Sequence, residues 1–106
     1  MEKESIQVAV QFDENRFTKV NMIKTKRSVA FMLNFLPGQE MKPHNHPDRE
    51  LYLYVVNGEG VLSINGEELK IRIGDVIRCG PEEQIGFINN SDHNVSMYAT
   101  MTKLTE

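Results

Sequence analysis

The segment from residue 42 to residue 60, KPHNHPDRELYLYVVNGEG, carries side chains whose types and spacing could bind a metal ion. His44 and His46 are separated by one residue, and Glu50 follows four residues after His46. Side chains at even spacing point to one face of an extended strand, so these three would converge. Two imidazoles and one carboxylate form the ligand set of some zinc hydrolases and of non-haem iron oxygenases. We therefore predict a divalent metal site at these three residues.

Two tyrosines in the same segment share the parity of Glu50. On a regular strand Tyr52 and Tyr54 would line a cavity beside the site, where their hydroxyls could bind a polar ligand. The opposite, outward face would then carry an aliphatic row, made of Leu51, Leu53 and Val55. Such a row needs cover from the N-terminal strands or from a partner subunit. Together with the strand edges that a small sheet must hide, it predicts a homodimer.

The elements that must hold these residues are predicted from apolar alternation and from turn residues. No segment has a capped apolar pattern of helical period, so helix should be scarce. The pair Asn65-Gly66 predicts a type I′ hairpin, and the two prolines and the glycine of residues 36–43 predict a loop. Short strands at this spacing are typical of a sandwich or barrel. We predict an all-β fold with strands at 6–12, 17–24, 29–36, 50–56, 61–64, 68–73, 76–79, 86–89 and 94–102.

The histidine segment resembles the first motif of the cupin superfamily, G-x5-H-x-H-x3,4-E-x6-G. Gly38, His44, His46 and Glu50 match that motif in identity and spacing. The closing glycine, Gly58, lies seven residues after position 50 instead of six. A bulge before this glycine would absorb the extra residue and would swap the strand faces beyond it.

A second segment, GDVIRCGPEEQIGFINN, resembles the second cupin motif, G-x5-P-x-G-x2-H-x3-N, in a degraded form. Gly74 and Asn89 match its ends, but Ile85 stands where the motif has its histidine. Phe87 stands where many family members carry an aromatic residue. A register shifted by one places Gly86 at the histidine position, so neither register restores a third imidazole. We expect Ile85 and Phe87 to face the pocket and the site to have fewer protein ligands than the family pattern.

The resemblance covers about residues 29–102 and implies a double-stranded β-helix, the cupin jelly-roll barrel, with the site in its mouth. We expect one cupin domain over residues 1–106. Metals of this family are usually Mn, Fe, Ni, Zn or Cu, and its members include dioxygenases, decarboxylases, isomerases and plain binding modules. Two hypotheses stay open. One is a metal-dependent cupin that binds a small polar metabolite and catalyses a reaction that the sequence does not identify. The other is a non-catalytic, metal-free module that binds a small molecule.

Composition excludes several other classes of function. The 106 residues suffice for one hydrophobic core, and the formal net charge of -3 comes from interspersed signs without a basic block. This pattern predicts no nucleic acid partner and no acidic membrane partner. The single cysteine, Cys79, cannot form an internal disulfide. No apolar run approaches the roughly 20 residues of a membrane span and the N-terminus has no signal-peptide pattern, so we expect a cytoplasmic protein.

Overall fold

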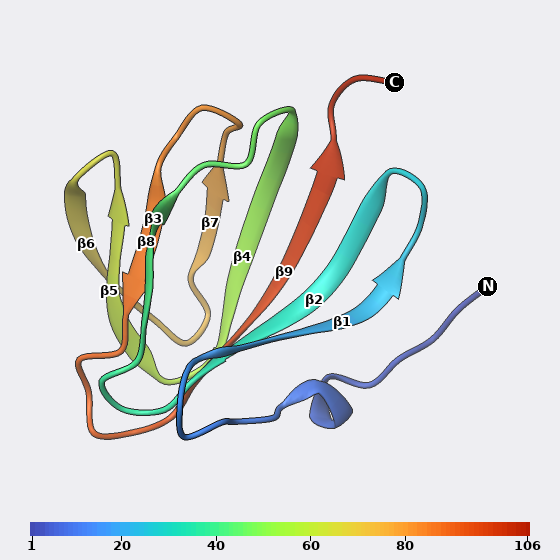
Figure 1. The fold of residues 1–106 in the computed structure, drawn as a ribbon. Helices are drawn as coiled ribbons and strands as arrows, with labels where there is room; N and C mark the ends of the chain where they lie inside the picture. Colours follow the sequence, from blue (N-terminus) through green and yellow to red (C-terminus); the bar gives the residue numbers. More distant parts are fainter.

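Two antiparallel sheets packed face to face make up the molecule (Figure 1). The computed structural model describes all residues from 1 to 106. Sheet A has the strand order β1-β2-β9-β4-β7, and sheet B has the order β3-β8-β5-β6. The elements are η1 (Ile6–Ala9), β1 (Thr18–Lys24), β2 (Ser28–Phe35), β3 (Glu40–His44), β4 (Arg49–Asn57), β5 (Glu59–Ile64), β6 (Glu67–Arg72), β7 (Val76–Cys79), β8 (Ile85–Ile88) and β9 (Val95–Lys103).

Eight of the nine predicted strands are confirmed, with ends that differ by no more than a few residues. The predicted hairpin joins β5 to β6, and both of its central residues have positive φ, 51° at Asn65 and 82° at Gly66. Two positive φ values are what a type I′ turn requires, and its twist matches that of the flanking strands. Local chemistry therefore determines this part of sheet B.

Two element predictions are wrong. Residues 6–12 form no strand but the short 3-10 helix η1, whose Ala9 is buried and accepts a 2.9 Å hydrogen bond from Asn34 Nδ2. Only Ala9 of this segment is buried against sheet A, and Val8 and Val10 remain exposed. The predicted loop at 36–43 contains most of β3. The strand tolerates Pro43 because this residue lies where the register of β3 with β8 shifts, so its missing N–H interrupts no hydrogen bond of the sheet.

No helix of the structure has the length and apolar character that crossing a membrane requires.

The N-terminal segment covers one part of the outer face of sheet A. Met32 and Asn34 of β2 are fully buried although they lie on the face opposite the core. Asn34 links this cover to the sheet, because its Oδ1 also accepts a 2.8 Å hydrogen bond from Ser96 Oγ of β9. These bonds satisfy the buried polar atoms, as burial without cost requires.

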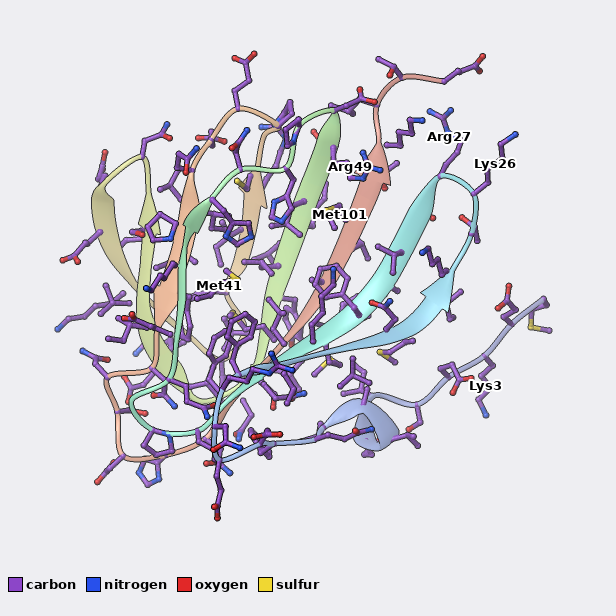
Figure 2. The ribbon with its side chains drawn as sticks, in the orientation of Figure 1. Lys3, Lys26, Arg27, Met41, Arg49 and Met101 are labelled. Carbon is purple, nitrogen blue, oxygen red and sulfur yellow. The ribbon has the colours of Figure 1, made fainter.

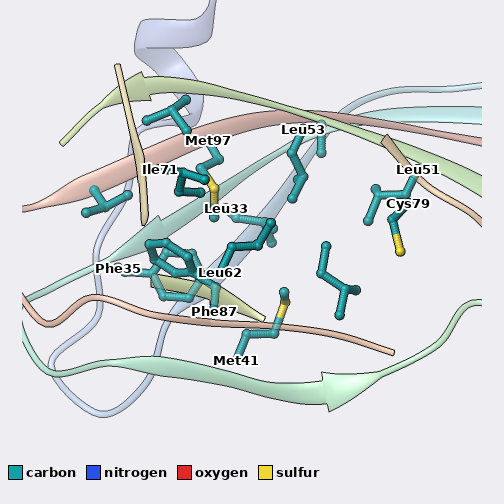
Figure 3. Packing of buried hydrophobic residues seen from close by; sticks show 14 of the residues in the cluster. Leu33, Phe35, Met41, Leu51, Leu53, Leu62, Ile71, Cys79, Phe87 and Met97 are labelled. Atoms are coloured by element: carbon teal, nitrogen blue, oxygen red, sulfur yellow. The ribbon is translucent and has the colours of Figure 1, made fainter. Parts of the chain in front are cut away.

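The hydrophobic core fills the space between the two sheets (Figure 3). Its base is aromatic: the ring of Phe35 lies 5.0 Å from that of Phe17 and 4.8 Å from that of Phe87, centroid to centroid. Strand β9 contributes an inward row, made of Val95, Met97, Ala99 and Met101. The core therefore holds β3 and β8 of sheet B against β2, β9 and β4 of sheet A, the strands that surround the candidate site.

Candidate functional site

The structure brings His44 and His46 together at the end of β3. Their Nε2 atoms lie 3.1 Å apart, and their rings meet at 72° with centroids 4.6 Å apart. His44 Nδ1 lies 2.8 Å from the carbonyl oxygen of Lys42. A carbonyl only accepts, so this nitrogen carries the proton and a neutral His44 presents the Nε2 lone pair to His46. Fixing one ring nitrogen on a backbone carbonyl is also how metal-binding histidines are oriented.

His46 is held in its neutral form by its surroundings. Burial lowers the pKa of His46 from its ordinary value of 6.5, and the electrostatic influence of His44, Lys19 and Arg49 lowers it further. Its Nδ1 atom is buried and has no hydrogen-bond partner. Unsatisfied buried polar atoms are uncommon, and they point to an unfilled interaction.

Two cations lie beside the pair. Lys19 of β1 is paired with Leu33, and its Nζ lies 4.6 Å from the centroid of the Phe31 ring. Arg49 begins β4 and donates its backbone N–H to the His46 carbonyl oxygen at 3.1 Å. Neither side chain forms an ion pair, since the arginine–carboxylate pair of the structure is Arg78–Glu50 and the other close contact of this kind joins His93 to Asp92. The potential around the imidazoles is therefore positive.

The predicted third ligand, Glu50, is not part of this site. It points to the outer face of sheet A, where its carboxylate accepts a 2.8 Å hydrogen bond from Arg78 Nε of β7. This bond raises the pKa of the Arg78 guanidinium. The register of β4 with β7 and β9 is regular from Arg49 to Val55, so the faces alternate without interruption. Its inward neighbour is Leu51, which is 3% exposed.

The spacing of the first cupin motif also places a different residue at the glutamate position. The first cupin motif allows three or four residues between its second histidine and its glutamate. With four, the glutamate position falls on Leu51, and Gly58 then follows after six residues as the motif requires. The irregularity of β4 falls between Val55 and Asn57, beyond the site. The structure thus supports the longer spacing, in which leucine replaces the glutamate.

The predicted tyrosine lining is also wrong. Tyr52 and Tyr54 share the outward face of Glu50 and are 43% and 42% exposed. The aliphatic row is inside, with Leu51, Leu53 and Val55 at 3%, 1% and 0% exposure. Because the aliphatic row is buried inside, it no longer supports the homodimer prediction, which then depends only on the exposed strand edges.

Ile85 and Phe87 both point into the interior as core residues. Ile85 is fully buried and lies directly opposite His44 in the pairing of β8 with β3. Phe87 lies deeper, against Phe35. Side chains directly opposite on paired strands are close neighbours, so Ile85 borders the imidazole pair. Both family ligand positions beyond the histidines, residues 51 and 85, are therefore aliphatic.

Cys79, which pairs with Leu51 across β7 and β4, adds no ligand. Burial raises the pKa of its thiol, and the nearby Glu83 raises it further. The Sγ atom is 3.6 Å from the Gly80 carbonyl oxygen and 3.7 Å from that of Glu83, to which a protonated thiol donates. The thiol is therefore neutral and inert at physiological pH.

The donor set fits a divalent metal only in part. No group of three or more His, Cys, Asp or Glu side chains is arranged to hold a metal ion. The 3.1 Å between the two Nε2 atoms does suit two ligands of one ion, because zinc–nitrogen bonds of about 2.05 Å place cis ligands about 2.9 to 3.3 Å apart. Two imidazoles without a carboxylate, beside two cations, make a weak cation site.

The fold and this imidazole site define a double-stranded β-helix protein with a reduced ligand set. The family model described as a cupin domain matches residues 31–101, so the chain belongs to the cupin family. The protein TT1209 from Thermus thermophilus has a similar structure, with a TM-score of 0.91, 20% identity, and coverage of 97% of this chain and 98% of that chain.

Two further solved structures are similar. A conserved protein with a double-stranded β-helix domain from Klebsiella pneumoniae shares 21% identity at a TM-score of 0.91, covering 97% of this chain and 90% of that chain. An RmlC-like cupin protein from Desulfovibrio desulfuricans shares 25% identity at a TM-score of 0.79, covering 93% and 95%. A comparison with curated protein sequences gives no match.

Proposed function

We propose that this cupin binds a small polar molecule through the His44–His46 pair and does so without a resident metal ion. One observation carries the proposal: the two remaining ligand positions of the family pattern are Leu51 and Ile85, which are both buried in the core, with Ile85 directly opposite His44. Cupins often bind metals, but these substitutions remove half of the family's ligand set.

The imidazole pair offers complementary groups to such a molecule. The two Nε2 atoms are donor and acceptor to each other, so a ligand that inserts between the rings and replaces this bond finds one donor and one acceptor. Lys19 and Arg49 favour a negatively charged or strongly dipolar ligand over a cation. The aliphatic side chains of Leu51 and Ile85 provide an apolar wall. A few polar groups on an apolar wall are typical of small-molecule sites.

A second candidate function is a two-histidine site for Zn²⁺, Ni²⁺, Mn²⁺ or Fe²⁺. The distance between the Nε2 atoms and the carbonyl contact of His44 favour it. His44 and His46 would hold the ion, and oxygen atoms of water or of the bound molecule would complete its coordination. Such an ion supplies Lewis acidity to a bound ligand.

Elemental analysis of protein purified without chelator, followed by titration with Zn²⁺ and with Ni²⁺, separates the two candidates. Substoichiometric metal and weak binding are expected from the first candidate. Full occupancy that disappears in His44→Ala and His46→Ala but persists in His93→Ala would establish the second. His93 is the matched control because it is exposed in a polar turn.

Ligand binding is tested by titrating metal-free, ¹⁵N-labelled protein with succinate while the ring nitrogens of the histidines are followed by NMR. The resonances of His44 and His46 should shift, and those of His93 should not. Unchanged ring resonances with succinate, and with the neutral polar probe glycerol, would contradict the proposed metal-free site.

A further inference from the structure

Three basic residues lie side by side across three neighbouring strands of sheet A. Arg27 immediately precedes β2, and its carbonyl oxygen accepts a 2.8 Å hydrogen bond from the backbone N–H of Lys103 in β9. Lys103 is paired in turn with Arg49, the first residue of β4. We call Arg27, Lys103 and Arg49 the basic row. Each member of the row lies two residues along the chain from an inward-facing residue, and these residues are Val29, Met101 and Leu51. The row therefore lies on the same face of sheet A as the core.

The basic row is electrostatically unfavourable by itself. Like charges directly opposite each other on antiparallel strands destabilise the pairing. No member of the row forms an ion pair in the structure. Arg27 donates one Nη2 bond to the Lys103 carbonyl oxygen at 3.1 Å, and Arg49 has only a long 3.5 Å contact with the Pro47 carbonyl oxygen. Most of the guanidinium donors are therefore free.

A cavity opens beside this row. Its volume is about 290 Å³, and it is lined by Lys26, Arg27, Lys103, Thr105 and Glu106. Figure 2 shows Lys26 and Arg27 at the tip of the β1–β2 hairpin, at the same end of sheet A as Arg49. One side of the cavity is held in place by Asp48, which accepts hydrogen bonds from the Leu104 backbone N–H at 2.9 Å and from Thr105 Oγ1 at 2.6 Å.

We propose that this cavity binds a compact oxyanion, a phosphate or carboxylate group of a small molecule, between Arg27 and Lys103, which line it, with Arg49 beside them in the basic row. Guanidinium groups match the geometry of both anions through paired N–H donors, and an anion would relieve the repulsion within the row. A net charge of -3 and the small number of cations argue against an extended polyanion. Arg49 borders both the basic row and the imidazole pair, but neither histidine lines this cavity, so the proposal does not depend on the function of the imidazole pair.

Inorganic phosphate and succinate, each compared with chloride at equal ionic strength, are the probes. Both should raise the melting temperature of metal-free protein, and calorimetric titration shows which of the two anions binds more tightly. Arg27→Gln/Arg49→Gln should weaken binding at least about tenfold, whereas Arg78→Gln, which alters an arginine already paired with Glu50, should not. His44→Ala/His46→Ala should retain phosphate binding, which separates this site from the imidazole site.

Two single substitutions test the row itself. Lys103→Gln should leave the melting temperature in chloride unchanged or higher, because it removes repulsion, and should abolish the increase caused by phosphate. Glu106→Gln removes the acidic side chain of the cavity and should tighten binding. Equal stabilisation of wild type, Arg27→Gln/Arg49→Gln and Lys103→Gln by phosphate would overturn the proposal, as would no stabilisation of wild type by either anion.

Discussion

The two faces of β4 have opposite environments although their residues alternate along one short strand. The inner face carries Leu51 and Leu53, which are buried between the sheets, and the outer face carries Tyr52 and Tyr54, which reach solvent. Glu50 belongs to the outer face and pairs with Arg78 instead of approaching the histidines. A displacement of one residue along a strand thus separates a metal ligand from a surface ion pair.

The donors around the imidazoles are determined by the side chains that enter the barrel and not by the order of residues in the motif. His44 faces Ile85 across two strands of sheet B, while Leu51 approaches from sheet A. Three elements far apart in the sequence therefore decide which donors surround the imidazoles.

The largest difference between the faces should be in stability. Leu53→Ala is expected to lower the free energy of unfolding by about 2 to 5 kcal/mol, because it leaves a cavity in the core. Tyr54→Ala on the same strand should cost clearly less, since that side chain is partly in solvent already. Urea denaturation of the two variants measures the difference. Equal losses would mean that both faces of β4 are covered.

The inner face should also be able to regain the family's ligand set. Ile85→His/Leu51→Glu is expected to tighten binding of Ni²⁺ or Zn²⁺ at least about tenfold, roughly 1.4 kcal/mol, with Ile85→His alone giving part of the gain. Without metal both variants should be less stable, because apolar side chains are replaced by buried polar groups. Calorimetric titration measures the affinity.

Ile88→His is the matched control for this experiment, because it adds a histidine to an exposed position of the same strand, β8. Its metal affinity should equal that of wild type. If the rebuilt site gained nothing while His44→Ala still abolished residual binding, residues 51 and 85 would not face the imidazoles.

The imidazole site should make stability depend on pH. Burial lowers the folded-state pKa of His46, so below about pH 6.5 the unfolded chain takes up a proton that the folded protein resists. Stability should therefore fall as pH decreases through this range, down to the lowered pKa. His46→Gln should flatten this dependence and His93→Gln should not, as measured by urea denaturation between pH 8 and pH 5. A wild-type profile that rises toward acid would contradict the assignment.

The smallest effect is expected on the outer face. Glu50→Gln should leave the free energy of unfolding nearly unchanged, because exposed ion pairs contribute little. It should also leave Zn²⁺ and Ni²⁺ binding unchanged, which a ligand could not do. A large loss of metal affinity in this variant would restore the carboxylate to the metal site and would reverse the assignment of the faces.

Much of the fold could be predicted from the sequence because its signals are local. Apolar alternation located eight strands, and Asn65-Gly66 located a turn whose positive φ values few other residues tolerate. The contact between His44 and His46 could be predicted for the same reason, because the two residues lie two positions apart in one chain segment. The cupin motifs then linked these strands to a known barrel.

The strands, the hairpin and the imidazole pair follow from local sequence signals, whereas tertiary packing selects the face of β4 that enters the core. Alternation along the strand predicts that its two faces differ. It does not predict which face is buried, because leucine and tyrosine side chains can both lie in a core, and these residues are Leu51, Tyr52, Leu53 and Tyr54. The choice depends on burial against sheet B and on the register with β7 and β9. The N-terminal segment is a similar case. Its residues 6–12 have the pattern of a strand, but they lie over the outer face of β2, where Ala9 accepts a hydrogen bond from Asn34. Such decisions require surfaces that exist only after distant segments have packed.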